Sequence, residues 1–189
     1  MRTPIQILAI SGSLRSTSTN TQLLKAMTAM APPDVYIQIS DDPGKLPHFS
    51  PELDNDASPE TVKTFRKRLA EADAVIICTP EYAFGVPGVL KNALDWIVSS
   101  AELMHKPVAA ISASPLSTGG NQAHASLLLT LGALTAAIPD EAKVMIPVVK
   151  KKLNEAGELT DAPTAAILLA ALNSLITLAK EKKQMKERT

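Results

Sequence analysis

Five apolar runs of strand length recur along the chain, and segments with helical periodicity separate them. The runs cover residues 5–10, 35–39, 74–78, 107–113 and 144–149. Strands that alternate with helices pair in parallel through right-handed crossover connections. The runs at 5–10 and 74–78 are apolar nearly throughout, as expected of strands covered on both faces. The pattern predicts an α/β fold, a three-layer sandwich around a five-stranded parallel sheet, in one domain that spans residues 1–189.

Helical patterns fill the intervals between these runs. The expected helices cover residues 19–30, a segment opened by Ser58 as N-cap and Pro59 in the first turn, a segment from about Pro87, residues 122–137, and a segment from a Thr160 cap to about residue 180. The third helix is predicted from apolar residues at the helical spacing i, i+3, i+4. They are Leu90, Ala93, Leu94, Ile97 and Val98. Residues 40–57 are irregular, and a loop of that length is usually a lid or an interface.

The charge balance excludes two classes of partner. Lysine plus arginine number 19 and aspartate plus glutamate number 19, so the formal net charge is zero. A nucleic-acid-binding domain usually carries a basic excess, and a protein that lies on lipid carries a basic amphipathic face. We therefore expect no nucleic-acid partner and no membrane partner. The locally basic residues 180–189 are expected to be a solvated helix end.

Cysteine content and hydropathy point to the cytoplasm. Cys78 is the only cysteine, so no intrachain disulfide can form, and its apolar surroundings predict a buried thiol. The N-terminus lacks the pattern of a signal peptide. The longest apolar run, residues 165–172, is shorter than the ~20 residues that span a bilayer. The cytoplasm is therefore the expected compartment.

The loops that follow the first, third and fourth strands have unusual compositions. Ligands of open α/β sheets bind beyond the carboxyl ends of the strands, where the strand order reverses. The three loops cover residues 11–20 (SGSLRSTSTN), 79–88 (TPEYAFGVPG) and 112–121 (SASPLSTGGN). A ligand site is therefore expected among them.

The first loop carries hydroxyl groups at six of its ten positions and one arginine, Arg15, without any acidic residue. Hydroxyls that can add hydrogen-bond donors are those of Ser11, Ser13, Ser16 and Ser18. With the N–H groups of a helix N-terminus and a guanidinium, they form a donor set suited to phosphate. A Ser/Thr-rich helix cap is the alternative, but it requires fewer hydroxyls. The loop lacks the P-loop pattern and has one glycine where dinucleotide folds need several, which favours a terminal monophosphate.

The second and third loops suit a flat ligand. Tyr82 and Phe84 place two rings at a strand end in a chain with only 3% aromatic residues. These rings either lie beside a planar ligand or fold back onto the core. The third loop has four hydroxyls and the pair Gly119 and Gly120, which permits positive φ and leaves room for a flat ligand. Together the three loops predict a pocket for a phosphorylated aromatic ligand.

Four stretches of the chain resemble the NADPH-dependent FMN reductase family, the flavodoxin-like group that includes chromate, quinone and azo-dye reductases. They are GSLRSTSTN at 12–20, LPHFSPELD at 46–54, PEYAFGVPGVLKNALDW at 80–96 and SASPLSTGG at 112–120. The resemblance implies a flavodoxin-like sheet of order 2-1-3-4-5 with FMN at its carboxyl edge. It also implies a homodimer or homotetramer in which partner helices help to form the pocket.

The resemblance further implies which residues bind FMN. The first loop would hold the phosphate through Ser11, Ser13, Arg15, Ser16 and Asn20. The second loop would lie along the isoalloxazine with Pro80, Glu81, Tyr82, Ala83 and Phe84, and the third would close the other side with Ser114, Ser117, Gly119 and Gly120. The family often has Asn where this chain has Ala83, so one hydrogen bond to flavin or substrate is missing. Substrate preference is affected more than flavin binding.

The implied activity is hydride transfer from NADPH or NADH to N5 of the flavin. The electrons then pass to a small acceptor, which is a quinone, an azo compound, a metal oxyanion or free flavin. Because the cofactor carries the chemistry, no catalytic side chain and no metal is expected. His48, His105 and His124 are too dispersed to form a metal site. Donor and acceptor are expected to use the same face in turn, in a ping-pong mechanism.

Two other functions remain open. A flavodoxin-like electron carrier would bind FMN without nicotinamide activity, but such carriers are usually strongly acidic and this chain has no net charge. A flavin-free binding or regulatory module would keep the loops and lose the activity, and Ala83 is its only support.

Overall fold

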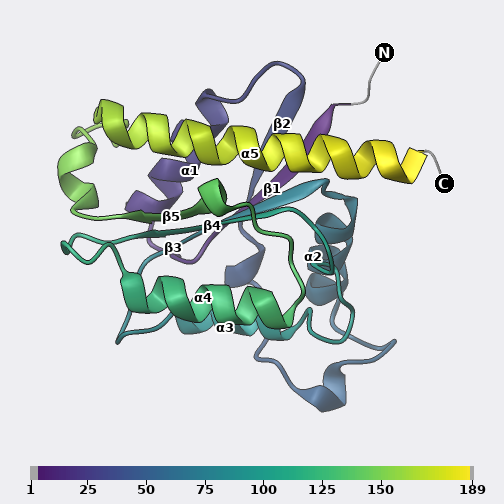
Figure 1. Ribbon diagram of the computed structural model, residues 1–189. Coiled ribbons are helices and arrows are strands. Elements are labelled where there is room, and N and C mark those ends of the chain that lie inside the picture. Colours follow the sequence, from purple (N-terminus) through teal and green to yellow (C-terminus); the bar gives the residue numbers. More distant parts are fainter. Residues whose placement is uncertain (1–3, 188–189) are drawn as a thin grey trace.

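The computed structural model describes residues 4–187 and places a five-stranded sheet between two layers of helices (Figure 1). The strands are β1 (Ile5–Ser11), β2 (Val35–Ser40), β3 (Ala74–Thr79), β4 (Val108–Ala113) and β5 (Lys143–Ile146). They lie in the order β2-β1-β3-β4-β5, and every pairing is parallel. The expected three-layer flavodoxin-like fold and its strand order are confirmed.

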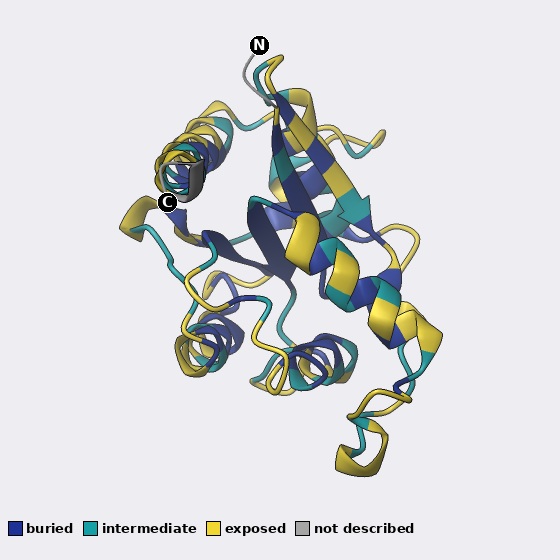
Figure 2. Ribbon diagram, turned by 90° about the vertical axis from the view of Figure 1, so that its right-hand side faces the viewer, coloured by how far each residue is buried: buried dark blue, intermediate teal, exposed yellow. Residues whose placement is uncertain are grey.

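Both faces of the sheet are covered by helices. The helices are α1 (Thr19–Ala29) and α5 (Ala162–Glu187) on one face, and α2 (Glu60–Glu71), α3 (Gly88–Asp95) and α4 (Asn121–Ala133) on the other. Ile7 and Ala9 of β1 belong to the core beneath α1 and α5, whereas Leu8 and Ile10 belong to the core beneath α2, α3 and α4. Figure 2 shows the helices turning their buried sides toward the strands. β3 and β4, which are central, are buried at every position.

Several boundaries differ from the sequence prediction, and α5 continues to Glu187, beyond the predicted residue 180. β5 ends before the predicted residue 149, because Val148 adopts a left-handed backbone (φ 51°) and a short 3-10 turn follows it. α4 ends at Ala133 and not at residue 137, because Ala137 forms a β-bridge with Pro107. α3 ends at Asp95, so Val98, predicted to lie within the helix, follows it and is 62% exposed.

Two predicted helix caps are also wrong. Ser58 donates its hydroxyl to carbonyl groups in the preceding loop, and Pro59 is the N-cap of α2. The side chain of Asp161, and not that of Thr160, accepts from the N–H of Thr164 (3.0 Å) at the start of α5. A carboxylate one residue later is the stronger cap because it also accepts from the Thr164 hydroxyl (2.6 Å).

The irregular segment 40–57 is fastened to α2 and α3. Both carboxylate oxygens of Asp42 accept from Nη1 of Arg68 at 2.9 Å. The indole N–H of Trp96 donates to the carbonyl O of Pro47 (2.8 Å), and Trp96 itself is fully buried. The segment is therefore held against the helices along its length, which a freely opening lid would not be.

Within residues 4–187, α5 is the one helix that is long and apolar enough to cross a membrane, over Ala162–Met185. Of the 18-residue apolar stretch of this helix, 39% is buried. Leu168, Leu172 and Leu175 pack in the core beside the sheet. The core helix of a soluble protein passes the same test of length and composition. The finding is therefore weak evidence for a membrane span.

Gly12 brings the first and second loops into contact. Its N–H donates to the carbonyl O of Cys78 at the end of β3 (2.8 Å). A Cβ at this position would lie 2.5 Å from Oγ1 of Thr79 and 3.1 Å from Cδ2 of Leu90. Because no larger residue permits this approach, glycine fixes the start of the first loop against the second.

Replacing Gly12 with alanine is expected to lower the free energy of unfolding by about 1–3 kcal/mol, because the methyl group must displace Thr79 and Leu90. Gly132→Ala in α4 is the matched control. Its Cβ would meet no atom within 4 Å, and it should stabilise the helix by about 0.5–1 kcal/mol. Urea denaturation measures both changes, and an unaltered stability of Gly12→Ala would contradict the close approach.

Candidate functional site

The loops after β1, β3 and β4 lie together at the carboxyl edge of the sheet, on the left of Figure 1. β1 is followed in sequence by β2 on one side, and β3 pairs with it on the other, so the strand order reverses at this point. Such a reversal opens a crevice between neighbouring loops. The structure therefore brings the predicted residues of all three loops to one edge.

The buried hydroxyls of the first loop hold the loop in shape. Ser11 Oγ donates to the carbonyl O of Ser13 (3.2 Å) and accepts from the hydroxyl of Thr21 (2.9 Å). Ser18 Oγ accepts from the N–H of Thr21 (3.3 Å) and so caps α1. Ser11 therefore donates within the protein and Ser18 accepts within it, and both bonds position the exposed part of the loop.

Arg15, Ser16 and Thr17 form the exposed rim of the first loop. Within the described chain, the Arg15 guanidinium has no hydrogen-bond or ion-pair partner, and the N–H groups of Ser16 and Thr17 have no acceptor. A free guanidinium, two hydroxyls and unpaired N–H groups before a helix N-terminus fit the phosphate of FMN. Thr17 was not among the predicted residues, although its hydroxyl belongs to the same run.

Asn20 lies beneath this rim and contacts β3. Its Oδ1 accepts from Sγ of Cys78 (3.3 Å), and both residues are buried. Burial raises the pKa of the Cys78 thiol, which keeps the group protonated and unreactive. The predicted burial of Cys78 is confirmed, and Asn20 is oriented toward the sheet by at least one hydrogen bond.

The second loop contains a tight two-residue turn between Tyr82 and Gly85. The N–H of each residue donates to the carbonyl O of the other, both at 3.0 Å. Ala83 (φ 49°) and Phe84 (φ 62°) are both left-handed, which defines a type I′ turn. Such turns prefer Asn and Gly, because the left-handed conformation costs other residues about 1–2 kcal/mol of conformational free energy each. Ala83 therefore affects the backbone as well as hydrogen bonding, because Asn tolerates this conformation better.

Glu81 connects the second loop to α4. Its Oε2 accepts from the N–H groups of Gln122 (2.8 Å) and Ala123 (2.9 Å). The N-cap of α4 is Gly120, which has no side chain, so a carboxylate from another loop satisfies the helix N-terminus. The sequence signal for this role was a helix that begins after glycine without a capping side chain.

The third loop turns at two successive left-handed glycines, Gly119 (φ 65°) and Gly120 (φ 78°). The predicted positive φ is confirmed. A Cβ at Gly119 would lie 3.3 Å from Cβ of Met145, so this glycine faces protein and not an open ligand space. Ser114 is buried, whereas Ser117 is exposed at the rim. Backbone and rim groups of this loop are the ones that a ligand can reach.

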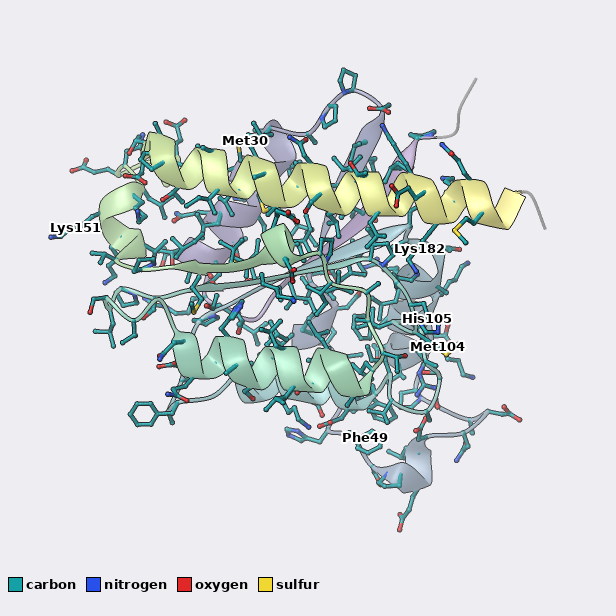
Figure 3. All side chains as sticks on the ribbon, in the orientation of Figure 1. Met30, Phe49, Met104, His105, Lys151 and Lys182 are labelled. Atoms are coloured by element: carbon teal, nitrogen blue, oxygen red, sulfur yellow. The ribbon has the colours of Figure 1, made fainter. Side chains whose placement is uncertain are left out.

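The histidines occupy separate environments. His105 lies at the edge of the molecule opposite Lys151, and Lys151 follows β5 at the carboxyl edge (Figure 3). His48 is exposed, whereas His124 in the first turn of α4 is 6% exposed and its Nδ1 has no hydrogen-bond partner among the described residues. Burial lowers the pKa of His124. Within residues 4–187, no three His, Cys, Asp or Glu side chains gather as metal ligands.

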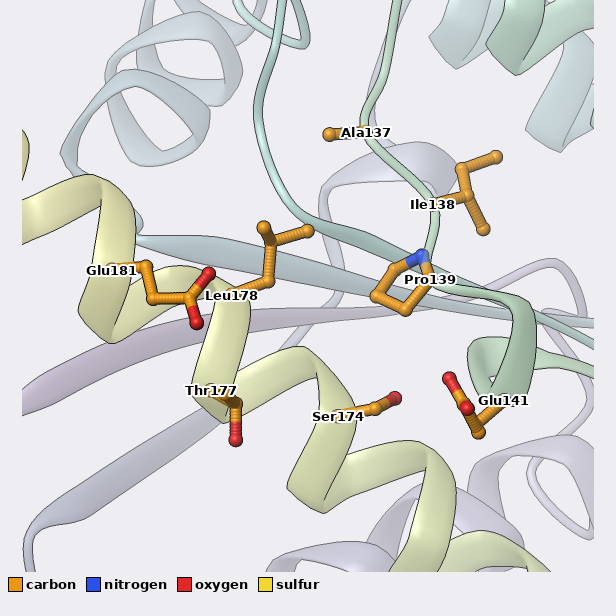
Figure 4. Close-up of a pocket in the computed structure, with 8 residues that line it drawn as sticks. All are labelled: Ala137, Ile138, Pro139, Glu141, Ser174, Thr177, Leu178 and Glu181. Atoms are coloured by element: carbon orange, nitrogen blue, oxygen red, sulfur yellow. The ribbon is translucent and has the colours of Figure 1, made fainter.

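A cleft of about 590 Å³ lies between α5 and the segment before β5 (Figure 4). Its lining residues are Ala137, Ile138, Pro139, Glu141, Ser174, Thr177, Leu178 and Glu181. None of them belongs to the three loops, and the segment leads into the amino end of β5. The cleft is therefore separate from the candidate site.

His124→Gln is expected to reduce the loss of folding stability that the parent shows as the pH falls below 6.5. The unfolded histidine takes up a proton near pH 6.5, whereas the buried folded one resists protonation, so the parent loses stability as the pH falls below 6.5. Glutamine removes this contribution. Thermal unfolding between pH 7 and about 5 measures the slope, with exposed His48→Gln as control. Equal slopes for the parent and His124→Gln would contradict the prediction.

Comparison with known proteins agrees with this geometry. A family model of NADPH-dependent FMN reductase matches residues 5–151. The chain is 33% identical over 177 residues to an NAD(P)H-dependent FMN reductase of Pseudomonas aeruginosa, and the match covers 93% of this chain and 95% of that protein. It is 29% identical over 178 residues to a quinone reductase of Escherichia coli, with 92% and 95% covered.

A solved structure supports the same relationship. The flavoenzyme NAD(P)H:acceptor oxidoreductase FerB from Paracoccus denitrificans matches with a TM-score of 0.81 at 29% identity, and the match covers 94% of this chain and 98% of that one. The three loops all lie within the residues that the family model matches. The chain therefore belongs to the NADPH-dependent FMN reductase family.

Proposed function

We propose that this protein is an FMN-dependent NAD(P)H oxidoreductase that passes electrons from nicotinamide to a small acceptor. The observation that carries the proposal is the unpaired Arg15 guanidinium beside the exposed hydroxyls of Ser16 and Thr17 at the N-terminus of α1. The exposed rings of Tyr82 and Phe84 lie on the neighbouring loop. Donors for a phosphate next to surfaces for a flat ring match the two ends of FMN.

The proposed site has exposed residues that contact FMN and buried residues that shape the loops. Arg15, Ser16 and the free N–H groups bind the phosphate, and Pro80 and Tyr82 lie along the ring system. The remaining members of the proposed site are Ser11, Ser13, Asn20, Glu81, Ala83, Phe84, Ser114, Ser117, Gly119 and Gly120. Of these, the buried Ser11, Ser13, Asn20 and Ser114 shape the loops.

Bound FMN supplies a hydride acceptor at N5 and carries the redox chemistry. The protein contributes orientation, exclusion of water and electrostatics. N–H groups of the loops stabilise the negative charge that develops on a reduced flavin. Glu81 is engaged by two N–H groups of α4, which suits a positioning role and not that of a general base. The acceptor is a quinone, an azo compound, a metal oxyanion or free flavin, and the related quinone reductase supports the first of these.

The proposed enzyme is a cytoplasmic homodimer or homotetramer. Two apolar side chains, Val98 after α3 and Leu129 on α4, are 62% and 78% exposed on the layer of helices that covers one face of the sheet. A second copy that covers them would bury this apolar surface. Sedimentation velocity tests this proposal, and a single monomeric species would contradict it.

Initial-rate kinetics are expected to follow a ping-pong pattern, because donor and acceptor use the same face of the flavin in turn. Double-reciprocal plots at several acceptor concentrations should then give parallel lines. Intersecting lines would contradict the shared face. If the protein bound FMN but failed to oxidise NADPH and NADH, the result would favour an electron carrier.

Arg15→Ala is expected to weaken FMN binding by about 10- to 100-fold, the effect of losing a charged hydrogen bond to phosphate. Lys25→Ala removes an exposed positive charge farther along α1 and is the matched control. Quenching of flavin fluorescence measures both dissociation constants. An unchanged affinity of Arg15→Ala would show that the first loop does not hold the phosphate.

A further inference from the structure

We propose that Phe84 is a stacking platform, presented by a fixed turn, that makes the enzyme prefer planar, conjugated acceptors to metal oxyanions. This inference rests on the proposed function, because it concerns the acceptor that the reduced flavin serves. Phe84 is a member of the proposed flavin site, and the inference adds that its exposed ring face also contacts the acceptor. It also discriminates among the acceptor classes that the family resemblance leaves open.

The exposure of Phe84 sets it apart from the other two phenylalanines. Phe65 is fully buried, and Phe49 packs edge-on against Trp96 with ring centroids 5.1 Å apart. Phe84 is 81% exposed, the highest exposed fraction among the large apolar side chains of the described residues. A ring that neither packs in the core nor pairs with another ring is available to a ligand.

The backbone fixes the position from which this exposed side chain extends. Phe84 occupies the second central position of the type I′ turn, where its left-handed φ of 62° is unfavourable for a bulky residue. Reciprocal hydrogen bonds between Tyr82 and Gly85 close the turn, and Glu81 anchors its start to α4. Strained residues of this kind persist where surrounding contacts fix them, and they cluster at ligand sites.

The turn lies at the edge of the sheet where an acceptor would reach the proposed flavin. It follows β3, at the carboxyl edge where the loop after β4 also lies (Figure 1). Tyr82, on the other side of the turn, is 51% exposed, so two aromatic side chains border the proposed flavin site. An acceptor that approaches the flavin from solvent passes this border.

The chemistry of the acceptor decides what such a border can recognise. A quinone is flat and conjugated, so it can stack on a phenyl ring. It takes up a hydride from the reduced flavin and one proton from water to give a hydroquinone, which is also flat. A metal oxyanion is hydrated and has no ring face, so the same phenyl group gives it no favourable contact.

The test compares Phe84→Ala and Phe84→Tyr with the parent, all loaded with FMN. Calorimetry with 1,4-naphthoquinone, without reductant, is expected to show about 3- to 10-fold weaker binding for Phe84→Ala. The ratio of kcat/KM for naphthoquinone to kcat/KM for chromate should fall by a similar factor. Phe84→Tyr keeps the ring face and should restore both values to within about twofold of the parent.

Met104→Ala is the matched control, because Met104 is 57% exposed and lies at the opposite edge of the molecule (Figure 3). It should change neither value. Unchanged naphthoquinone binding in Phe84→Ala would overturn the proposal, as would equal losses with naphthoquinone and chromate. A loss of oligomers in Phe84→Ala would assign the ring to a subunit interface and also overturn it. If the parent protein fails to bind FMN, the result contradicts the proposed function itself, and with it the role of Phe84 toward an acceptor.

Discussion

The close approach of Gly12 to Thr79 is the contact on which the carboxyl edge of this sheet depends. It allows the end of β1 to hydrogen-bond with the end of β3, and so it sets the first loop beside the second. The second loop is tied in turn to α4 by the carboxylate of Glu81. Two contacts between residues distant in sequence thus hold three loops as one surface, before any ligand binds.

The residues of that surface have two roles: some stabilise the loops, and others are free to bind a ligand. Buried hydroxyls such as Ser11 and Ser18 satisfy backbone and side-chain groups within the first loop. Arg15 and its exposed neighbours have no such partners in residues 4–187 and remain available to a phosphate. Preorganised donors of this kind lose little conformational entropy when a ligand binds. The same division applies to the second loop, where the turn is closed by backbone bonds and Phe84 remains exposed.

The sequence predicted the layers well because they follow from local patterns. Apolar runs gave the strands, and their crossovers require parallel pairing. Helix ends were less predictable. Asp161 and not Thr160 caps α5. α4 ends earlier than predicted because Ala137 forms a β-bridge with Pro107. Loop compositions identified the edge, but not the roles within it. The bond from Glu81 to α4 and the left-handed turn at Phe84 depend on tertiary contacts that no local pattern encodes.

The visible spectrum of the purified protein with FMN, recorded before and after anaerobic addition of NADPH, distinguishes a nicotinamide-driven flavoenzyme from an electron carrier. We expect binding to perturb the flavin bands and NADPH then to bleach them rapidly. Bands that shift without bleaching under NADPH or NADH would contradict nicotinamide-driven catalysis and leave an electron carrier. A flavin spectrum identical to that of free FMN would mean that the loop around Arg15 holds a different ligand.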